Sequence, residues 1–118
     1  MLPGKRSVRV GDVVLKEVAS LLLERVRDPR VQGVTLTGIR LSDDLKQARI
    51  FFSVMGDQPL VERAQEGLNS ATGFLKREIG RRVDLRYIPG ITFVYDPSLK
   101  TGSHMERVFE KLREAEVE

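Results

Sequence analysis

The positively charged side chains that follow residue 75 are the groups in this sequence best suited to chemistry with an anion. Two acidic residues stand among five basic ones between residues 76 and 86, directly after a run of small residues. Guanidinium and ammonium groups bind phosphate oxygens, and small side chains let a sugar–phosphate backbone approach closely. We therefore predict a phosphate-binding surface made of Ser70, Ala71, Thr72, Gly73, Lys76, Arg77, Arg81, Arg82 and Arg86.

The two ends of the sequence differ in charge. Residues 1–9 contain Lys5, Arg6 and Arg9 and no acidic side chain, whereas residues 103–118 contain five glutamates and three basic residues. We expect residues 1–6 to form a mobile basic arm that, with Arg9, releases counterions from a polyanion, and residues 114–118 to form a mobile acidic tail. Net charge is only +3, so ordinary solvated helix faces remain an alternative explanation of this pattern.

The sequence offers few groups for catalysis or metal binding. It has no cysteine, which excludes a disulfide framework, a thiolate zinc site and a thiol nucleophile. Its single histidine, His104, has no obvious partner, and we find no glycine-rich phosphate loop and no nucleophile paired with a base. We expect no catalytic residue, no metal, no cofactor and no enzymatic activity. A small phosphatase of the acylphosphatase type remains an alternative that an assay would test.

Length and apolar patterning indicate one domain, residues 1–118, with no membrane segment. The longest apolar run is Leu21-Leu22-Leu23, far short of the roughly 20 residues that cross a bilayer. No apolar segment follows the N-terminal charges as it would in a secretory signal. We expect a cytoplasmic monomer.

The first expected element is an amphipathic helix. Either Ser7 or Asp12 could cap its start, and Asp28-Pro29 should end it, because proline disfavours helical geometry at the preceding residue. Apolar residues recur at three- and four-residue spacing along it, namely Leu15, Val18, Ala19, Leu22 and Val26.

Three strands are expected. Residues 34–41 alternate with a phase slip at Gly38, which indicates a β-bulge. Residues 46–55 alternate without a slip and should pair antiparallel with the first strand; a third strand covers residues 91–95. One face of the second strand should carry Ala48, Ile50, Phe52 and Val54, and the other Arg49, Phe51, Ser53 and Met55. We interpret Phe51 and Tyr87 chiefly as core residues, with base stacking as the alternative.

Residues 59–82 read as two amphipathic helices that meet at a sharp bend within residues 69–73, a run of poor helix formers. The backbone N–H groups at the start of the second helix, near Gly73, would then point toward a phosphate. We assign Ala71 and Gly73 chiefly to the bend. Apolar periodicity directs Arg77 and Arg81 toward solvent and places Lys76 and Arg82 beside the buried stripe.

The order helix, strand, strand, helix, bend, helix, strand is that of a type II KH domain. It gives an α+β fold with a three-stranded sheet and helices on one face. We expect one further helix after residue 103, whose apolar stripe would pack on the domain itself or dock on a partner.

Several segments resemble the ribosome-binding factor A family. An Ala-X-Gly sequence, Ala71-Thr72-Gly73, stands where a usual KH domain has Gly-X-X-Gly. The agreement extends over nearly the whole chain: Arg27-Asp28-Pro29-Arg30, Leu41-Ser42-Asp43-Asp44-Leu45, the run 68–75, Glu78-Ile79-Gly80-Arg81-Arg82 and Phe93-Val94-Tyr95-Asp96.

The resemblance implies binding to the small ribosomal subunit and its 16S ribosomal RNA, near the decoding-site region and the 5′-end helix. It also implies a role in late maturation and 16S ribosomal RNA processing, support of growth in the cold, and no catalytic residue or cofactor. A KH-type protein that binds another structured RNA remains the alternative.

Overall fold

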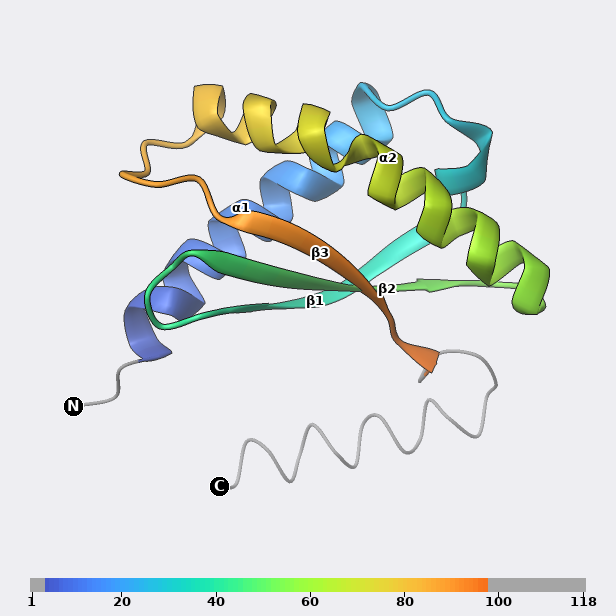
Figure 1. The fold of residues 1–118 in the computed structure, drawn as a ribbon, viewed down its shortest axis with the longest axis horizontal. Coiled ribbons are helices and arrows are strands. Elements are labelled where there is room, and N and C mark those ends of the chain that lie inside the picture. The colour runs from blue at the N-terminus through green and yellow to red at the C-terminus, as the bar shows by residue number, and fades with distance from the viewer. Residues whose placement is uncertain (1–3, 98–118) are drawn as a thin grey trace.

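A computed structural model describes residues 4–97, which form an α+β fold of the KH type. In chain order the elements are α1 (Gly4–Glu24), a short 3-10 helix η1 (Pro29–Val31), β1 (Val34–Leu41), β2 (Gln47–Val54), α2 (Gln58–Arg82) and β3 (Gly90–Tyr95). Figure 1 shows α1 and α2 packed together against the sheet. The expected C-terminal helix, the tail 114–118 and His104 lie outside the described residues.

The three strands form one sheet in the order β1-β2-β3. β1 and β2 are antiparallel, with Leu36 opposite Phe52 and Gly38 opposite Phe51, so the register shifts between Leu36 and Gly38. This confirms the predicted bulge at Gly38. β3 runs parallel to β2, with Ile50 opposite Phe93. Residues 83–89, between α2 and β3, form no helix or strand.

The core lies between the sheet and the two helices. The predicted inner face of β2 is confirmed, since Ala48, Ile50, Phe52 and Val54 are all buried. Ile50, Phe52 and Val54 pack in one cluster with residues of α1, α2 and β3, chiefly Val14, Val18, Leu21, Leu68, Leu75, Ile79 and Phe93. Within residues 4–97 no helix is long and apolar enough to cross a membrane.

Helix α1 begins earlier than its expected caps. It starts at Gly4, so Ser7 and Asp12 lie inside the helix and the prediction of an N-cap at either residue was wrong. Gly11 is also internal, and a Cβ there would lie 3.3 Å from the Cγ2 of Ile39. A side chain at residue 11 would therefore require the Ile39 side chain to shift by a few tenths of an ångström.

Asp28 caps η1 instead of ending α1, which stops at Glu24. The Asp28 Oδ1 accepts from the backbone N–H of Arg30 at 2.9 Å, and the Arg30 Nη2 donates to Oδ2 at 2.7 Å. These hydrogen bonds stabilise the carboxylate and lower the pKa of Asp28. The Asp-Pro-Arg segment therefore forms a local cap that turns the chain from α1 into the sheet.

Helix α2 is continuous across the predicted break. Residues 58–82 are one α-helix, drawn in Figure 1 as an unbroken coil that changes direction near its middle. Thr72 Oγ1 donates to the backbone oxygen of Asn69 at 2.8 Å, a contact that often bends helices. The predicted division into two helices was wrong, and only the bend remains.

Candidate nucleic-acid interface

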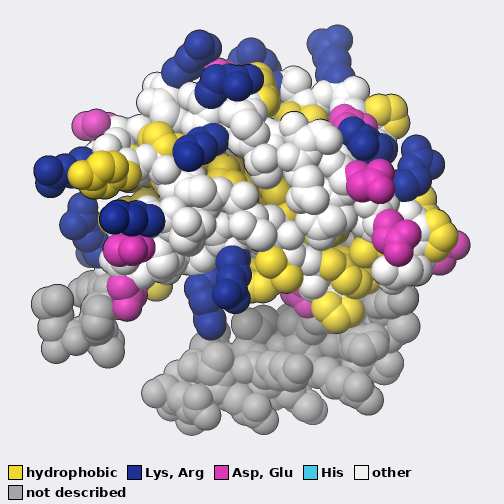
Figure 2. All heavy atoms as spheres, in the orientation of Figure 1, with side chains coloured by type: hydrophobic (Ala, Val, Ile, Leu, Met, Phe, Trp, Pro, Cys, Tyr) yellow, Lys and Arg dark blue, Asp and Glu magenta, His cyan; other side chains and the backbone are white. Residues whose placement is uncertain are grey.

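The second half of α2 carries an outward stripe of exposed residues that follows helical periodicity. Ser70, Gly73, Arg77 and Arg81 are exposed and recur at three- and four-residue spacing, with Lys76 exposed beside them. Figure 2 shows basic side chains gathered along the upper edge of the molecule, over this half of α2. We refer to these five residues as the α2 surface. Its exposure agrees with the predicted direction of Arg77 and Arg81.

The α2 surface presents side chains and no free helix start. Because α2 is continuous, the backbone N–H groups near Gly73 belong to the helix interior, and the predicted N–H site at a second helix start was wrong. Among residues 4–97, a Cβ on Gly73 would meet only the Nη1 of Arg77, at 3.9 Å. The Arg77 guanidinium therefore lies over bare backbone at the bend, where a phosphate can approach it closely.

Two of the predicted small residues face inward or are already bonded. Ala71 is buried in the core, and Thr72 uses its hydroxyl proton within the helix. Ala71 also lines a hollow of about 230 Å³ between the end of α1 and the middle of α2, together with Ser70, Gly67 and Phe74. These positions support the structural role assigned to Ala71, while Ser70 stays on the surface.

Two comparisons with known proteins identify the family of this chain. The family model described as ribosome-binding factor A matches residues 6–109. The chain is 44% identical over 116 residues to ribosome-binding factor A of Syntrophus aciditrophicus, which covers 98% of this chain and 94% of that protein. This chain belongs to the ribosome-binding factor A family.

A second relative supports the same membership, and solved structures share the fold. The Syntrophobacter fumaroxidans protein is 44% identical over 95% of this chain and 97% of its own length. The solution structure of a Thermotoga maritima putative ribosome-binding factor A has a TM-score of 0.68 at 28% identity, covering 86% of this chain and 93% of that one. The Thermus thermophilus crystal structure reaches 0.67 at 23% identity, over 74% and 91% of the two chains.

In this member of the ribosome-binding factor A family, a buried carboxylate orders part of the basic surface. Glu78 is only 8% exposed, and its Oε2 accepts from the Nη1 of Arg81 at 3.1 Å. Arg25, directly after α1, places its Nη1 3.7 Å from the Glu78 Oε1 and its guanidinium 5.8 Å from the centre of the Phe74 ring. Glu78 and Arg25 were missed from the sequence. Glu78 stands between Leu75 and Ile79 of the buried apolar stripe, and this position could have indicated a buried carboxylate.

Arg82 lies on the side of α2 that faces α1. Its Nη1 donates to the Glu17 Oε2 at 3.2 Å, and both side chains are about one-third exposed. The pair joins the end of α2 to the middle of α1. Unlike Arg77, this predicted site residue is engaged within the fold.

Arg86 and Tyr87 extend the basic region beyond α2. The Arg86 guanidinium lies 5.7 Å from the centre of the Tyr87 ring, and Tyr87 is 60% exposed. The interpretation of Tyr87 as a core residue was therefore wrong. An exposed aromatic ring beside an arginine is suited to stacking on a base.

The predicted N-terminal arm is helical where the structure describes it. Lys5, Arg6 and Arg9 lie in the first turns of α1, and Arg6 and Arg9 are exposed. Figure 1 shows the start of α1 well apart from the second half of α2. The predicted site residues therefore form two separate basic regions. Within residues 4–97 no group of His, Cys, Asp or Glu side chains could hold a metal.

Replacing Glu78 with glutamine should destabilise the fold. The neutral side chain would leave Arg25 and Arg81 without their carboxylate, and hydrogen bonds to charged groups contribute about 1.5–3 kcal/mol. Because Arg81 is largely exposed, we expect a loss of about 1–2 kcal/mol in the free energy of unfolding. Urea denaturation measures it, with Glu62→Gln on the exposed side of α2 as control. Equal stabilities for both variants would contradict a structural role for Glu78.

Proposed function

We propose that this protein binds the small ribosomal subunit through phosphate contacts from the α2 surface. The exposed stripe of Ser70, Gly73, Lys76, Arg77 and Arg81 carries the proposal, because it combines cations with backbone that a phosphate can approach. A Thermus thermophilus ribosome-binding factor A, similar in fold with a TM-score of 0.57, has been fitted into the map of a 30S complex. Membership of the same family supports the same partner here.

The proposed role is assistance in late maturation of the subunit and in processing of its 16S ribosomal RNA. The protein would act in the cytoplasm as a monomer, near the decoding-site region and the 5′-end helix, and would use no cofactor. Phosphate contacts position a protein on RNA without reading sequence. The missing Gly-X-X-Gly loop favours recognition of RNA shape over single-strand sequence. The proposed role requires no catalytic residue.

Cosedimentation with isolated small subunits and with whole ribosomes, across a salt series, tests the proposal. We expect binding to the free small subunit, weaker binding to whole ribosomes, and affinity that falls as salt rises. The three exposed cations of the α2 surface, Lys76, Arg77 and Arg81, together with Arg86 beyond its end, should give a slope of log affinity against log salt of about −3 or steeper.

Two other results would contradict the proposal. Absence of binding to free subunits would remove the functional assignment while leaving the fold unchanged. Equal binding to an unrelated structured RNA, added as competitor at the same nucleotide concentration, would favour a general KH-type RNA-binding protein instead.

A further inference from the structure

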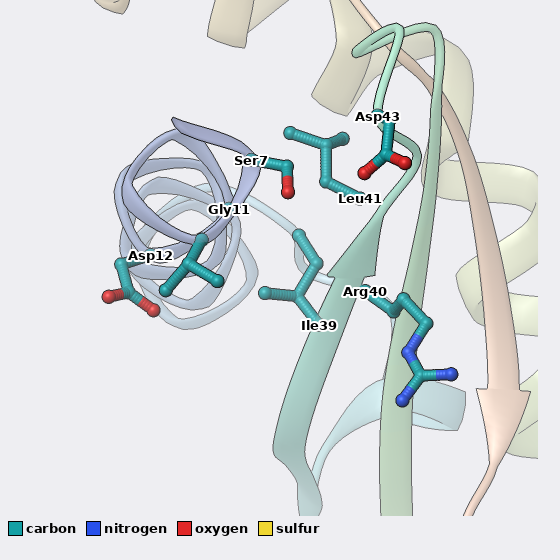
Figure 3. A pocket seen from close by; sticks show the side chains of 8 residues that line it. Ser7, Gly11, Asp12, Ile39, Arg40, Leu41 and Asp43 are labelled. Atoms are coloured by element: carbon teal, nitrogen blue, oxygen red, sulfur yellow. The ribbon is translucent and has the colours of Figure 1, made fainter. Parts of the chain in front are cut away.

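The face of the sheet that points away from the helices carries two arginines side by side. Arg40 of β1 is the direct register partner of Arg49 of β2, and Thr92 of β3 continues the row. All three residues are exposed. Figure 3 shows Ile39 and Leu41 directed toward α1, while the side chain of Arg40 points away from it. We refer to Arg40, Arg49 and Thr92, with the adjacent Phe51, as the sheet surface.

The two arginines face each other without a counter-charge in the described part of the chain. Like charges directly opposite each other on neighbouring strands destabilise a sheet. No ion pair within residues 4–97 includes Arg40 or Arg49. Other arginines of the fold do have carboxylate partners, namely Arg25, Arg30, Arg81 and Arg82. The fold thus tolerates an unfavourable pair that an external anion would stabilise.

An aromatic ring lies next to this pair. Phe51 follows Arg49 by two residues on the same face of β2 and stands opposite Gly38 at the bulge. A Cβ on Gly38 would meet no atom of residues 4–97 within 4 Å, so the described part of the chain leaves space beside Phe51 on the β1 side. Val94 is its register partner on β3. A base could therefore lie against the Phe51 ring while its phosphates reach the two arginines.

We propose that the sheet surface binds a second, single-stranded segment of RNA. Arg40 and Arg49 would hold phosphates, and Phe51 would stack on a base. Aromatic side chains and arginines on a sheet are a combination suited to unpaired RNA. The inference rests on the proposed function, which supplies the RNA. Because the sheet surface and the α2 surface lie on opposite layers of the fold, the protein would sit between two RNA segments.

The test compares two double variants of the full chain, Arg40→Gln with Arg49→Gln and Lys16→Gln with Arg27→Gln. Both lose the same net charge, and the control residues are exposed and belong to neither surface. Binding to isolated small subunits is measured across a salt series. For the sheet variant we expect the slope of log affinity against log salt to become shallower, with its magnitude reduced by about 1.4–1.8, since each lost phosphate contact contributes about 0.7–0.9. The control should keep the wild-type slope.

Thermal unfolding of the same variants identifies what the arginines bind. Removing a like-charge pair should leave the melting temperature equal or higher. A lower melting temperature with an unchanged slope would mean that the arginines bind a segment of this chain, such as the acidic residues 106–118, and would overturn the proposal. An unchanged slope and melting temperature would overturn it too. If the α2 surface variants still lost binding, the proposed function would stand without the sheet surface. Absence of binding by the wild-type protein would contradict the proposed function and this inference alike.

Discussion

Reversing the charges of Lys76 and Arg77 should lower affinity for isolated small subunits at least about a hundredfold. Both side chains are exposed, and no ion pair within residues 4–97 includes either of them. A hydrogen bond to a charged group contributes about 1.5–3 kcal/mol, and each 1.4 kcal/mol is a factor of ten in affinity. Replacement by glutamate adds repulsion from phosphate to the loss of these contacts. Cosedimentation of Lys76→Glu with Arg77→Glu measures the effect.

Lys76 and Arg77 were chosen so that a loss of binding can be distinguished from a loss of folding. Arg81→Glu would place a second carboxylate beside the buried Glu78, so a loss of binding could follow from destabilisation. Lys76 and Arg77 have no such neighbour to disturb, and circular dichroism should show an unchanged helix content. Lys16→Glu with Arg27→Glu is the matched control and should retain most of the binding. Equal losses in both double variants would indicate an effect of net charge and would exclude the α2 surface as the site.

The strands were the part of the fold best predicted from the sequence. Alternation in residues 46–55 identified the buried face of β2, and the slip at Gly38 identified the bulge. Both signals are local, because a residue's side of the sheet follows directly from its position along the strand. The resemblance to ribosome-binding factor A rested on segments spread along the whole chain and is confirmed by the family match.

Helix α2 shows where local propensity was a poor guide. Residues 69–73 are weak helix formers, and on this ground a break was predicted. Leu68, Ala71 and Leu75 are nevertheless all buried, so the apolar stripe continues through the weak segment at three- and four-residue spacing. Burial of such a stripe stabilises a helix more than the propensity of a few residues opposes it. The backbone N–H groups near Gly73 therefore lie inside the helix, and only the side-chain part of the predicted phosphate-binding surface remains a hypothesis.

The ion pairs of the site required the tertiary structure. Periodicity alone predicted that Arg77 faces solvent. Arg82 and Glu17 are 65 residues apart in the sequence, and neither segment contains a pattern that predicts their contact. Arg25 and Glu78 are separated in the same way. The sequence thus predicted the outward direction of Arg77 and Arg81, which are exposed, but not which basic residues form ion pairs within the fold.

The same substitution at two glycines of α2 should change stability in opposite directions. A Cβ on Gly67 would lie 2.8 Å from the Cγ1 of Val31 and 2.9 Å from the Cβ of Arg30, so α2 and η1 must separate to accept it. Overpacking of this kind costs about 1–3 kcal/mol. Neither Gly67 nor Gly73 has a positive φ, and a Cβ on Gly73 has room. Alanine at residue 73 should therefore stabilise the helix by up to about 1 kcal/mol.

Thermal unfolding measures both effects in one series. After the gain in helix propensity is subtracted, Gly67→Ala should lose up to about 2 kcal/mol, a fall of up to roughly 15 °C in melting temperature for a domain of this size. Gly73→Ala should raise the melting temperature by a few degrees. Each variant is the control for the other, since both add one methyl group to the same helix. A higher melting temperature for Gly67→Ala would show that η1 can shift to accommodate the added methyl group. A lower melting temperature for Gly73→Ala would mean that the bend itself requires glycine.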